Sequence, residues 1–185
     1  MGDRGADRSF SPPVRAVGDG YMITLDREER ALLVRLLDEL SALLTSDADE
    51  HQPLLSKLFP PAYADDEEKE VEYQRLMRDD LVASRLAAIN VMRNALGPGA
   101  DAAGSDAHGD GDGDEDLESG PLDEGATIAF MQSVNAVRLV LGSMLDITDD
   151  DDADAADDGA SSEHQLYVFL SWLLEWTVQA LSGTG

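Results

Sequence analysis

One uninterrupted helical stretch constrains this chain more than any other feature. Residues 65–96 contain neither glycine nor proline, the residues that most often break helices. The stretch begins with four acidic residues, which favour a helix N-terminus, and residues 97–99 (Gly-Pro-Gly) favour its end. A helix of that length spans about 48 Å. The sequence therefore predicts one long helix on which two later apolar helices pack.

One face of this predicted helix is apolar except near its middle. Three- and four-residue steps along it pass through Val71, Gln74, Arg78, Leu81, Arg85, Ile89, Met92 and Leu96. Arg78 and Arg85 point in one direction about 10 Å apart, and Asp79 and Asp80 are close in sequence. The arginines either form ion pairs at the edge of the core or line a pocket for an anion or a partner's acidic side chain. We favour the structural role, since ion pairs between helices are commoner than binding sites.

The other predicted elements are shorter. Residues 14–25 predict a hairpin that turns at residues 18–20, Gly-Asp-Gly. Helices are expected over residues 26–44, where Asp26 and Glu29 resemble a capping box, 122–145 and 163–181, with a helical turn at 53–58. Phe59 and Tyr63 are expected to fill the core beside that turn. The fold class is therefore mainly α, a four-helix bundle-like domain with a short N-terminal β-hairpin and two disordered acidic loops.

The length of 185 residues indicates a single domain. We expect a disordered tail at residues 1–11. The helical domain then covers residues 12–182, interrupted by acidic linkers at 97–121 and 146–162, which are too polar to pack.

Charge is concentrated in the linkers. The net charge is −26, but residues 101–124 hold ten acids and residues 146–163 hold nine, with no Lys or Arg in either segment. The rest of the chain carries only −7. Direct nucleic-acid binding is not expected, because it depends on cationic side chains that neutralise phosphates.

Other features bear on the location of the protein. The chain has no cysteine, which excludes disulfides, thiolate metal sites and thiol redox chemistry. No signal peptide is recognisable, and the apolar residues 166–181 are too few to span a membrane. We therefore expect a cytoplasmic protein without a membrane partner.

The helix predicted at 122–145 carries an arginine on its apolar stripe. Arg138 lies among Met131, Val134, Leu141 and Leu145, with Asn135 and Gly142 beside it. A buried arginine is costly unless its donors are satisfied, so a carboxylate or carbonyl of another helix should bind it. The candidates are Asp79, Asp80 and Glu175. Gly142 would let another helix approach closely. A structural role for Arg138 is favoured, and an anion or partner site is the alternative.

The last predicted helix is apolar around most of its circumference, which predicts a central position or a shared subunit interface. Trp172 and Trp176 lie one turn apart within it. Two interpretations have equal weight: the tryptophans fill the core of one chain, or they anchor an interface, including that of a homodimer.

No motif predicts an enzyme. The sequence lacks the zinc-protease, nucleophile-elbow and phosphate-loop patterns, and His51, His108 and His164 have no metal-ligand spacing. The segment 106–117 resembles a calcium loop in part, but Leu117 stands where the bidentate glutamate is needed. We expect no catalytic residue, no metal and no cofactor.

Four segments resemble a known family. They are residues 59–63 with the acidic helix entry, residues 73–81 with Arg85, residues 135–142, and the last helix at 166–181. Together they resemble the actinobacterial domain of unknown function whose genes often lie near that of the Clp protease adaptor, over residues 10–182 without the acidic loops. The resemblance implies a bacterial cytoplasmic protein without established catalytic activity. It also implies a regulatory role, since some members are linked to transcription under oxidative stress through a sigma factor. That link involves a cysteine pair, which this chain lacks, so redox sensing does not carry over.

The leading hypothesis is a regulatory protein that binds a basic protein surface, such as a transcription or Clp-system component, with acidic loops that steer association. The alternative is a sensor of a small anionic ligand held by Arg78, Arg85 or Arg138.

Overall fold

The structure is a computed structural model that describes residues 12–46, 52–55, 57–97, 117–147 and 161–183. Helices make up 70% of these residues. The elements are β1 (Val14–Val17), β2 (Gly20–Leu25), α1 (Arg27–Thr45), α2 (Gln52–Leu55), α3 (Glu67–Leu96), β3 (Leu117–Leu122), α4 (Glu124–Met144) and α5 (Ser162–Leu181). The chain is mainly helical, as predicted, but the four-helix bundle arrangement is not confirmed.

The helix boundaries follow the capping signals of the sequence. Asp26 and Glu29 form a reciprocal capping box at the start of α1, in which Asp26 Oδ1 accepts a hydrogen bond of 2.7 Å from the Glu29 amide. Asp66 caps α3 by accepting from the Lys69 amide at 3.1 Å. Gly97 ends α3 with a φ of 78°, which favours glycine. These predictions from local sequence are confirmed.

The predicted hairpin belongs to a three-stranded antiparallel sheet of order β1-β2-β3. Gly18 makes the β1–β2 turn with a φ of 60°. The third strand corrects the prediction that residues 97–121 form an acidic linker throughout, because β3 pairs with β2 at the end of that segment. A strand containing Gly120 and Pro121 has little local strand signal, and pairing with a distant strand determines it. Of the predicted loops, residues 98–116 and 148–160 lie outside the described residues.

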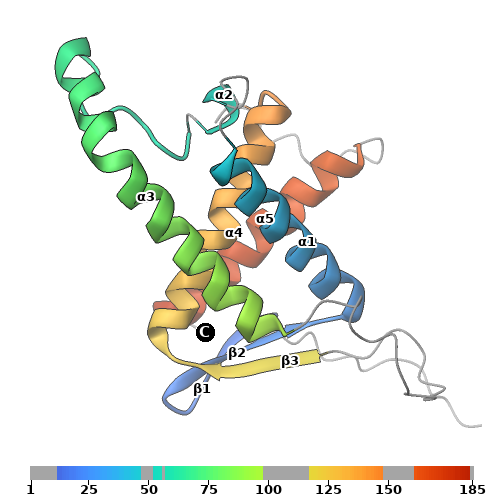
Figure 1. Ribbon diagram of the computed structural model, residues 1–185. Helices are drawn as coiled ribbons and strands as arrows, with labels where there is room; N and C mark the ends of the chain where they lie inside the picture. The colour runs from blue at the N-terminus through green and yellow to red at the C-terminus, as the bar shows by residue number, and fades with distance from the viewer. Residues whose placement is uncertain (1–11, 47–51, 56, 98–116, 148–160, 184–185) are drawn as a thin grey trace, which may run out of the picture.

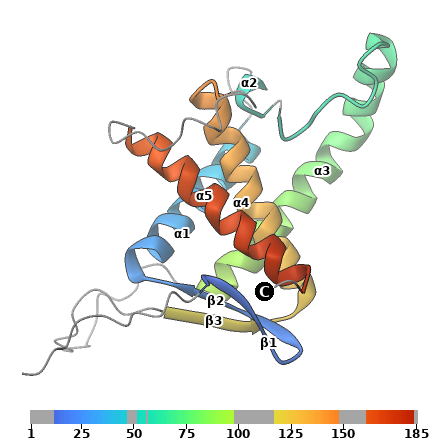
Figure 2. The same ribbon diagram turned by 180° about the vertical axis from the view of Figure 1, so that it is seen from behind.

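The central helix is α4, whereas the sequence predicted that the two later helices pack on the long helix α3. It packs against α1, α2, α3 and α5, and it also contacts β2 and β3. Its buried residues recur along its whole length, from Thr127 to Gly142. The sheet lies at one end of the helices, and α5 crosses α4 on the face opposite α3 (Figures 1 and 2). The helix α5 packs mainly on α4 and β1.

The core is formed by side chains from the three strands and from the four long helices α1, α3, α4 and α5. Phe130 of α4, Leu170 of α5 and Ile23 of β2 are fully buried in it. From α3, only Ile89, Met92 and Leu96 are buried. The N-terminal part of α3 extends away from the other helices (Figure 1).

Candidate functional site

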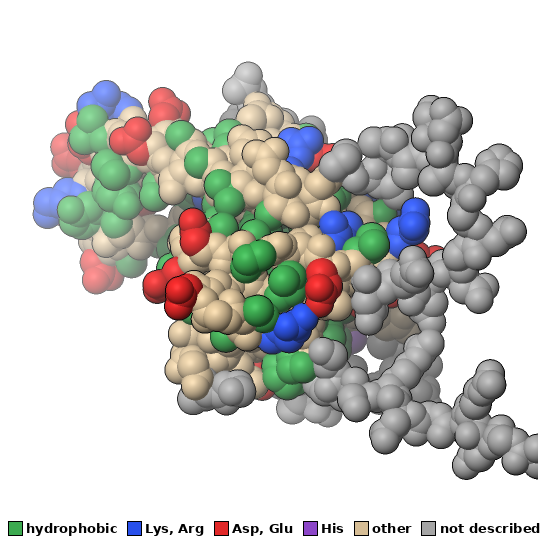
Figure 3. All heavy atoms as spheres, turned by 90° about the horizontal axis from the view of Figure 1, so that it is seen from below, with side chains coloured by type: hydrophobic (Ala, Val, Ile, Leu, Met, Phe, Trp, Pro, Cys, Tyr) green, Lys and Arg blue, Asp and Glu red, His purple; other side chains and the backbone are tan. Residues whose placement is uncertain are grey.

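The projecting part of α3 is the first surface that stands out. We define the α3 arm as residues 65–77. Val71 and Leu76 in the arm are 63% and 57% exposed, and Met77 is exposed as well. The stripe of the sequence therefore packs only in its second half, and the prediction that Val71 belongs to a core-facing stripe is wrong. Figure 3 shows the far end of α3 with hydrophobic side chains exposed among charged ones.

Local contacts hold the arm in a helix. Lys69 Nζ lies 2.7 Å from Asp66 Oδ2, and Arg75 Nη2 lies 2.7 Å from Glu72 Oε1. Glu70 accepts hydrogen bonds from the side chain of Gln74 and from the backbone of Tyr63. The three side-chain pairs are three or four residues apart, the spacing that stabilises helices, and the bond from Tyr63 ties the arm to the segment before it.

These contacts also change the acidity of the arm. The pKa values of Asp66, Glu70 and Glu72 are lowered, chiefly by side-chain hydrogen bonds from Lys69, Gln74 and Arg75 respectively. The carboxylates are therefore ionised at neutral pH, and the arm is acidic.

A cavity of about 330 Å³ lies between α3 and α4. From α3 it is lined by Leu81, Ser84, Arg85, Ala88 and Ile89, and from α4 by Gln132, Ser133, Asn135 and Ala136. Ile89 and Ala136 form buried apolar walls, whereas Ser84 and Gln132 are exposed at the rim. The cavity thus offers polar and apolar surface in similar measure and opens to solvent.

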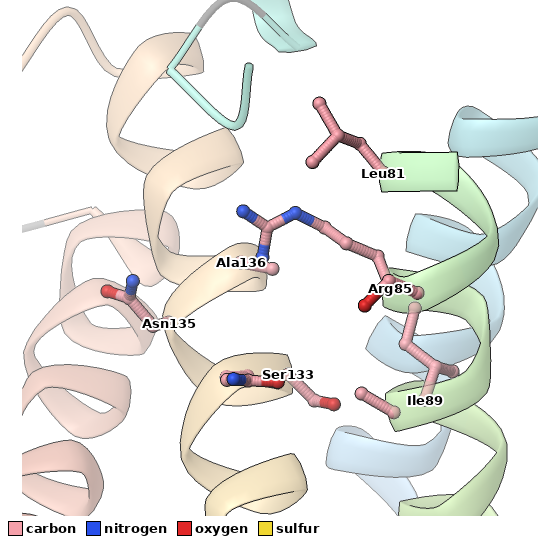
Figure 4. A pocket seen from close by; sticks show the side chains of 9 residues that line it. Leu81, Arg85, Ile89, Ser133, Asn135 and Ala136 are labelled. Atoms are coloured by element: carbon pink, nitrogen blue, oxygen red, sulfur yellow. The ribbon is translucent and has the colours of Figure 1, made fainter. Parts of the chain in front are cut away.

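Arg85 is the cationic residue of this cavity. Its side chain reaches from α3 toward α4 (Figure 4). Arg85 Nη2 donates a hydrogen bond of 3.2 Å to the Leu58 carbonyl oxygen, and the guanidinium lies 5.8 Å from the centre of the Phe59 ring. Burial lowers the pKa of Arg85. Among the described residues, no carboxylate forms an ion pair with it.

Arg78 shares the aromatic contact of Arg85 but does not line the cavity. Its guanidinium lies 5.9 Å from the centre of the Phe59 ring. Phe59 packs against the core, as predicted, whereas Tyr63 is 45% exposed and pairs edge-to-face with Tyr73 of the arm. The prediction that Tyr63 fills the core is therefore wrong.

The other predicted site residues do not converge on one place. Asp79 and Asp80 are exposed, and Asn135 lies at the edge of the cavity, apart from the Arg85 guanidinium (Figure 4). Arg138 instead faces α5: its Nε donates a hydrogen bond of 2.7 Å to Ser171 Oγ, and its guanidinium stacks 4.7 Å from the centre of the Tyr167 ring. The structure thus places a hydroxyl and an aromatic ring of α5 at Arg138, whereas the sequence predicted a carboxylate or a carbonyl of another helix.

The residues predicted to allow close approach and to anchor an interface lie at α5. The Cβ of an alanine at Gly142 would lie 3.2 Å from Tyr167 Cε2, which confirms that this glycine allows close helix packing. Trp172 and Trp176 are partly buried and pack against the core of the chain. Their use in a homodimer stays a prediction.

Sequence reasoning missed Arg30. It lies on α1, and its Nη1 and Nη2 donate hydrogen bonds to the carbonyl oxygens of Leu96 at 2.6 Å and Leu117 at 2.8 Å. Burial lowers the pKa of Arg30. Its acceptors are 66 and 87 residues away in sequence, so no local pattern points to it.

The described residues hold no group of three or more His, Asp or Glu side chains that could bind a metal ion. None of the helices in the described part combines the length and the apolar character needed to cross a bilayer. The partial calcium loop and His51 and His108 lie outside the described residues, apart from Leu117 at the end of that loop.

Comparison with known proteins identifies a family whose function is unknown. A family model described as a domain of unknown function, DUF2017, matches residues 11–181. Comparisons with curated proteins and with solved structures gave no match.

Proposed function

The chain belongs to the DUF2017 family of unknown function, and we propose that it is a non-enzymatic interaction protein whose α3 arm binds a partner protein with a basic surface. The observation that carries the proposal is the arm itself. In a helix of 30 residues, the buried side chains all lie at or beyond Ile89. Packing within the chain therefore does not account for the length of the helix.

The arm already has the form that a partner helix needs. Its N-cap, its side-chain pairs and the contacts of Tyr63 with Glu70 and Tyr73 favour the helical state. A preformed helix loses little conformational freedom on binding, so less of the interaction energy is spent on ordering it.

The chemistry of the arm defines the partner. It carries six carboxylates against two cationic side chains, a net charge of −4. Val71 and Leu76 supply exposed apolar surface on two sides of the helix, since five residues turn an α-helix by about 140° beyond a full turn. A basic partner surface that encloses the arm and contacts both sides would complement these features. The resemblance described above makes a transcription or Clp-system component the first partner to test.

The test compares two matched double variants. The tagged full-length chain and the variants are used to capture proteins from lysate at low and high salt, and each captured protein is then purified and its affinity measured directly. Val71→Ser with Leu76→Ser removes apolar surface from the arm. Val168→Ser with Val178→Ser removes exposed apolar surface from α5, where these residues are 38% and 46% exposed. We expect a basic protein that binds the wild type and the α5 variant, binds the arm variant at least about tenfold more weakly, and dissociates at high salt.

Equal binding by the arm variant and the wild type would overturn the proposal. A complex that persists at high salt would contradict the charge complementarity. A second copy of the chain as the bound species, seen as a dimer in sedimentation that the arm variant loses, would replace the basic partner by self-association.

A further inference from the structure

Arg85 and Arg30 are both partly buried, and burial lowers the pKa of each. They differ in their acceptors, since the one acceptor that the described part of the chain gives the Arg85 guanidinium is a backbone carbonyl at 3.2 Å. In contrast, Arg30 has two carbonyl acceptors, and Arg93 pairs with Asp38 at 2.8 Å. The remaining donors of the Arg85 guanidinium can therefore bind an anion, whose charge makes such hydrogen bonds stronger than bonds to a neutral acceptor.

The guanidinium also borders a space of suitable size. The adjoining cavity of about 330 Å³ lies within the range of about 300–1,000 Å³ that small-ligand pockets occupy. Figure 4 shows Arg85 extending across this space from α3 toward α4. Because Ser84 and Gln132 at its rim are exposed, a ligand can enter from solvent.

The lining selects the chemical class of the ligand. Arg85 is the one charged residue of the cavity, and the chain as a whole is strongly acidic, so a single negative charge fits better than several. Leu81, Ala88, Ile89 and Ala136 offer apolar surface to the remainder of a ligand. A planar carboxylate matches the fork of a guanidinium.

From this arrangement we propose that the Arg85 cavity binds a small organic monocarboxylate with an apolar body. The carboxylate accepts hydrogen bonds from Arg85, and the apolar body contacts Ile89 and Ala136. The hydroxyl of Ser84 and the amide of Gln132 add polar groups to the rim of the cavity. This site is separate from the α3 arm, so it extends the proposed function and does not depend on it.

The experiment titrates the full-length chain with benzoate and hexanoate. Benzamide, which has the shape of benzoate without its charge, and inorganic phosphate are the comparison probes. Binding is measured by calorimetry and by two-dimensional amide NMR. We expect saturable one-to-one binding of the carboxylates, with the largest shifts at the amides of Ala88, Ser133 and Ala136. Benzamide and phosphate should bind at least about tenfold more weakly.

Two variants separate the site from general charge effects. Arg85→Gln should weaken benzoate binding about tenfold or more. Arg78→Gln removes a cation from the same helix and from the same Phe59 ring but outside the cavity, and it should change the affinity by less than about twofold.

Several results would overturn the proposal. They are the absence of saturable carboxylate binding at millimolar concentration, equal binding of benzamide, and equal losses in both variants. Phosphate binding as tight as that of benzoate would overturn the monocarboxylate assignment in favour of a general anion site. If Arg85→Gln does not fold, amide shifts of the wild type that fall away from the cavity would equally refute the site.

Discussion

Arg30 Nη1 donates a hydrogen bond of 2.6 Å to the carbonyl oxygen of Leu96, the last residue of α3. The last carbonyl groups of a helix accept no hydrogen bond from an amide of the same helix, so a side chain that donates to one of them stabilises the helix end. The second bond of Arg30, to Leu117, joins the same side chain to the first residue of β3. One arginine of α1 therefore holds the two ends of the segment that leads from α3 to the sheet.

Replacement of Arg30 by methionine should destabilise the protein. The variant keeps most of the apolar side chain and loses both charged hydrogen bonds, which leaves two carbonyls without their donors. We expect the free energy of unfolding to fall by about 2–3 kcal/mol. Urea denaturation followed by circular dichroism measures it. Arg27→Met, an exposed position on the same helix, should change it by less than about 0.5 kcal/mol. Equal losses in the two variants would show that the Arg30 bonds do not stabilise the fold.

The two halves of α3 should respond differently to truncation. Ile89→Ala removes a side chain that is 1% exposed, and it should lower the free energy of unfolding by about 2–4 kcal/mol. Leu76→Ala, at 57% exposed, should lower it by less than about 0.5 kcal/mol. Both substitutions introduce alanine into the interior of the same helix, so the difference between the two losses measures mainly the burial of the side chain that is removed. A large loss for Leu76→Ala in a monomer would mean that the arm packs on the protein.

Local and distant signals explain how much the sequence could predict. Helix starts and ends depend on neighbours in sequence, so Asp26, Glu29 and Gly97 were sufficient to place them. How much of α3 is buried depends on how far the other helices extend along it, and the spacing of apolar residues within α3 does not show this. For the same reason, the sequence could place Arg78 and Arg85 on one helix face but could not tell that only Arg85 borders a cavity.

The third strand and Arg30 of α1 were not predicted because their contacts join segments that are distant in the sequence. Residues 117–122 form a strand because Leu117 and Ser119 pair with Leu25 and Ile23, about a hundred residues earlier in the chain. Arg30 was missed because both of its acceptors are brought near only by the fold. Contacts between distant segments therefore account for most of what the sequence did not predict.

The helical state of the arm should depend on pH. The folded-state pKa values of Asp66, Glu70 and Glu72 lie below their ordinary values. A lowered pKa in the folded state stabilises the helix when the pH is above the unfolded pKa, and this stabilisation is lost as protons bind at lower pH. The arm should therefore lose helical structure as the pH falls from about 5 toward 2.

Amide NMR of residues 67–72, with the carboxyl carbons of the three acids titrated in parallel, measures this loss. The matched variant is Asp66→Asn, because asparagine caps a helix about as well as aspartate and does not titrate. It should reduce the pH dependence at the Lys69 amide to the part caused by Glu70 and Glu72, while it leaves the cap in place. Carboxyl titrations of Asp66, Glu70 and Glu72 at their ordinary pKa values would contradict the prediction.

The contact between α4 and α5 at Gly142 should tolerate no branched side chain. A Cβ there would already lie 3.2 Å from the Tyr167 ring, and valine adds two methyl groups in the same space. Since the ring is buried and cannot move freely, we expect Gly142→Val to lower the free energy of unfolding by about 1–3 kcal/mol. Gly125→Val is the control in the same helix, where a Cβ would meet only the Asp123 carboxylate at 3.4 Å. The same valine should cost less there, because Gly125 is exposed near the helix start. Equal unfolding free energies of the two variants in urea would mean that α5 can shift away from α4 without loss.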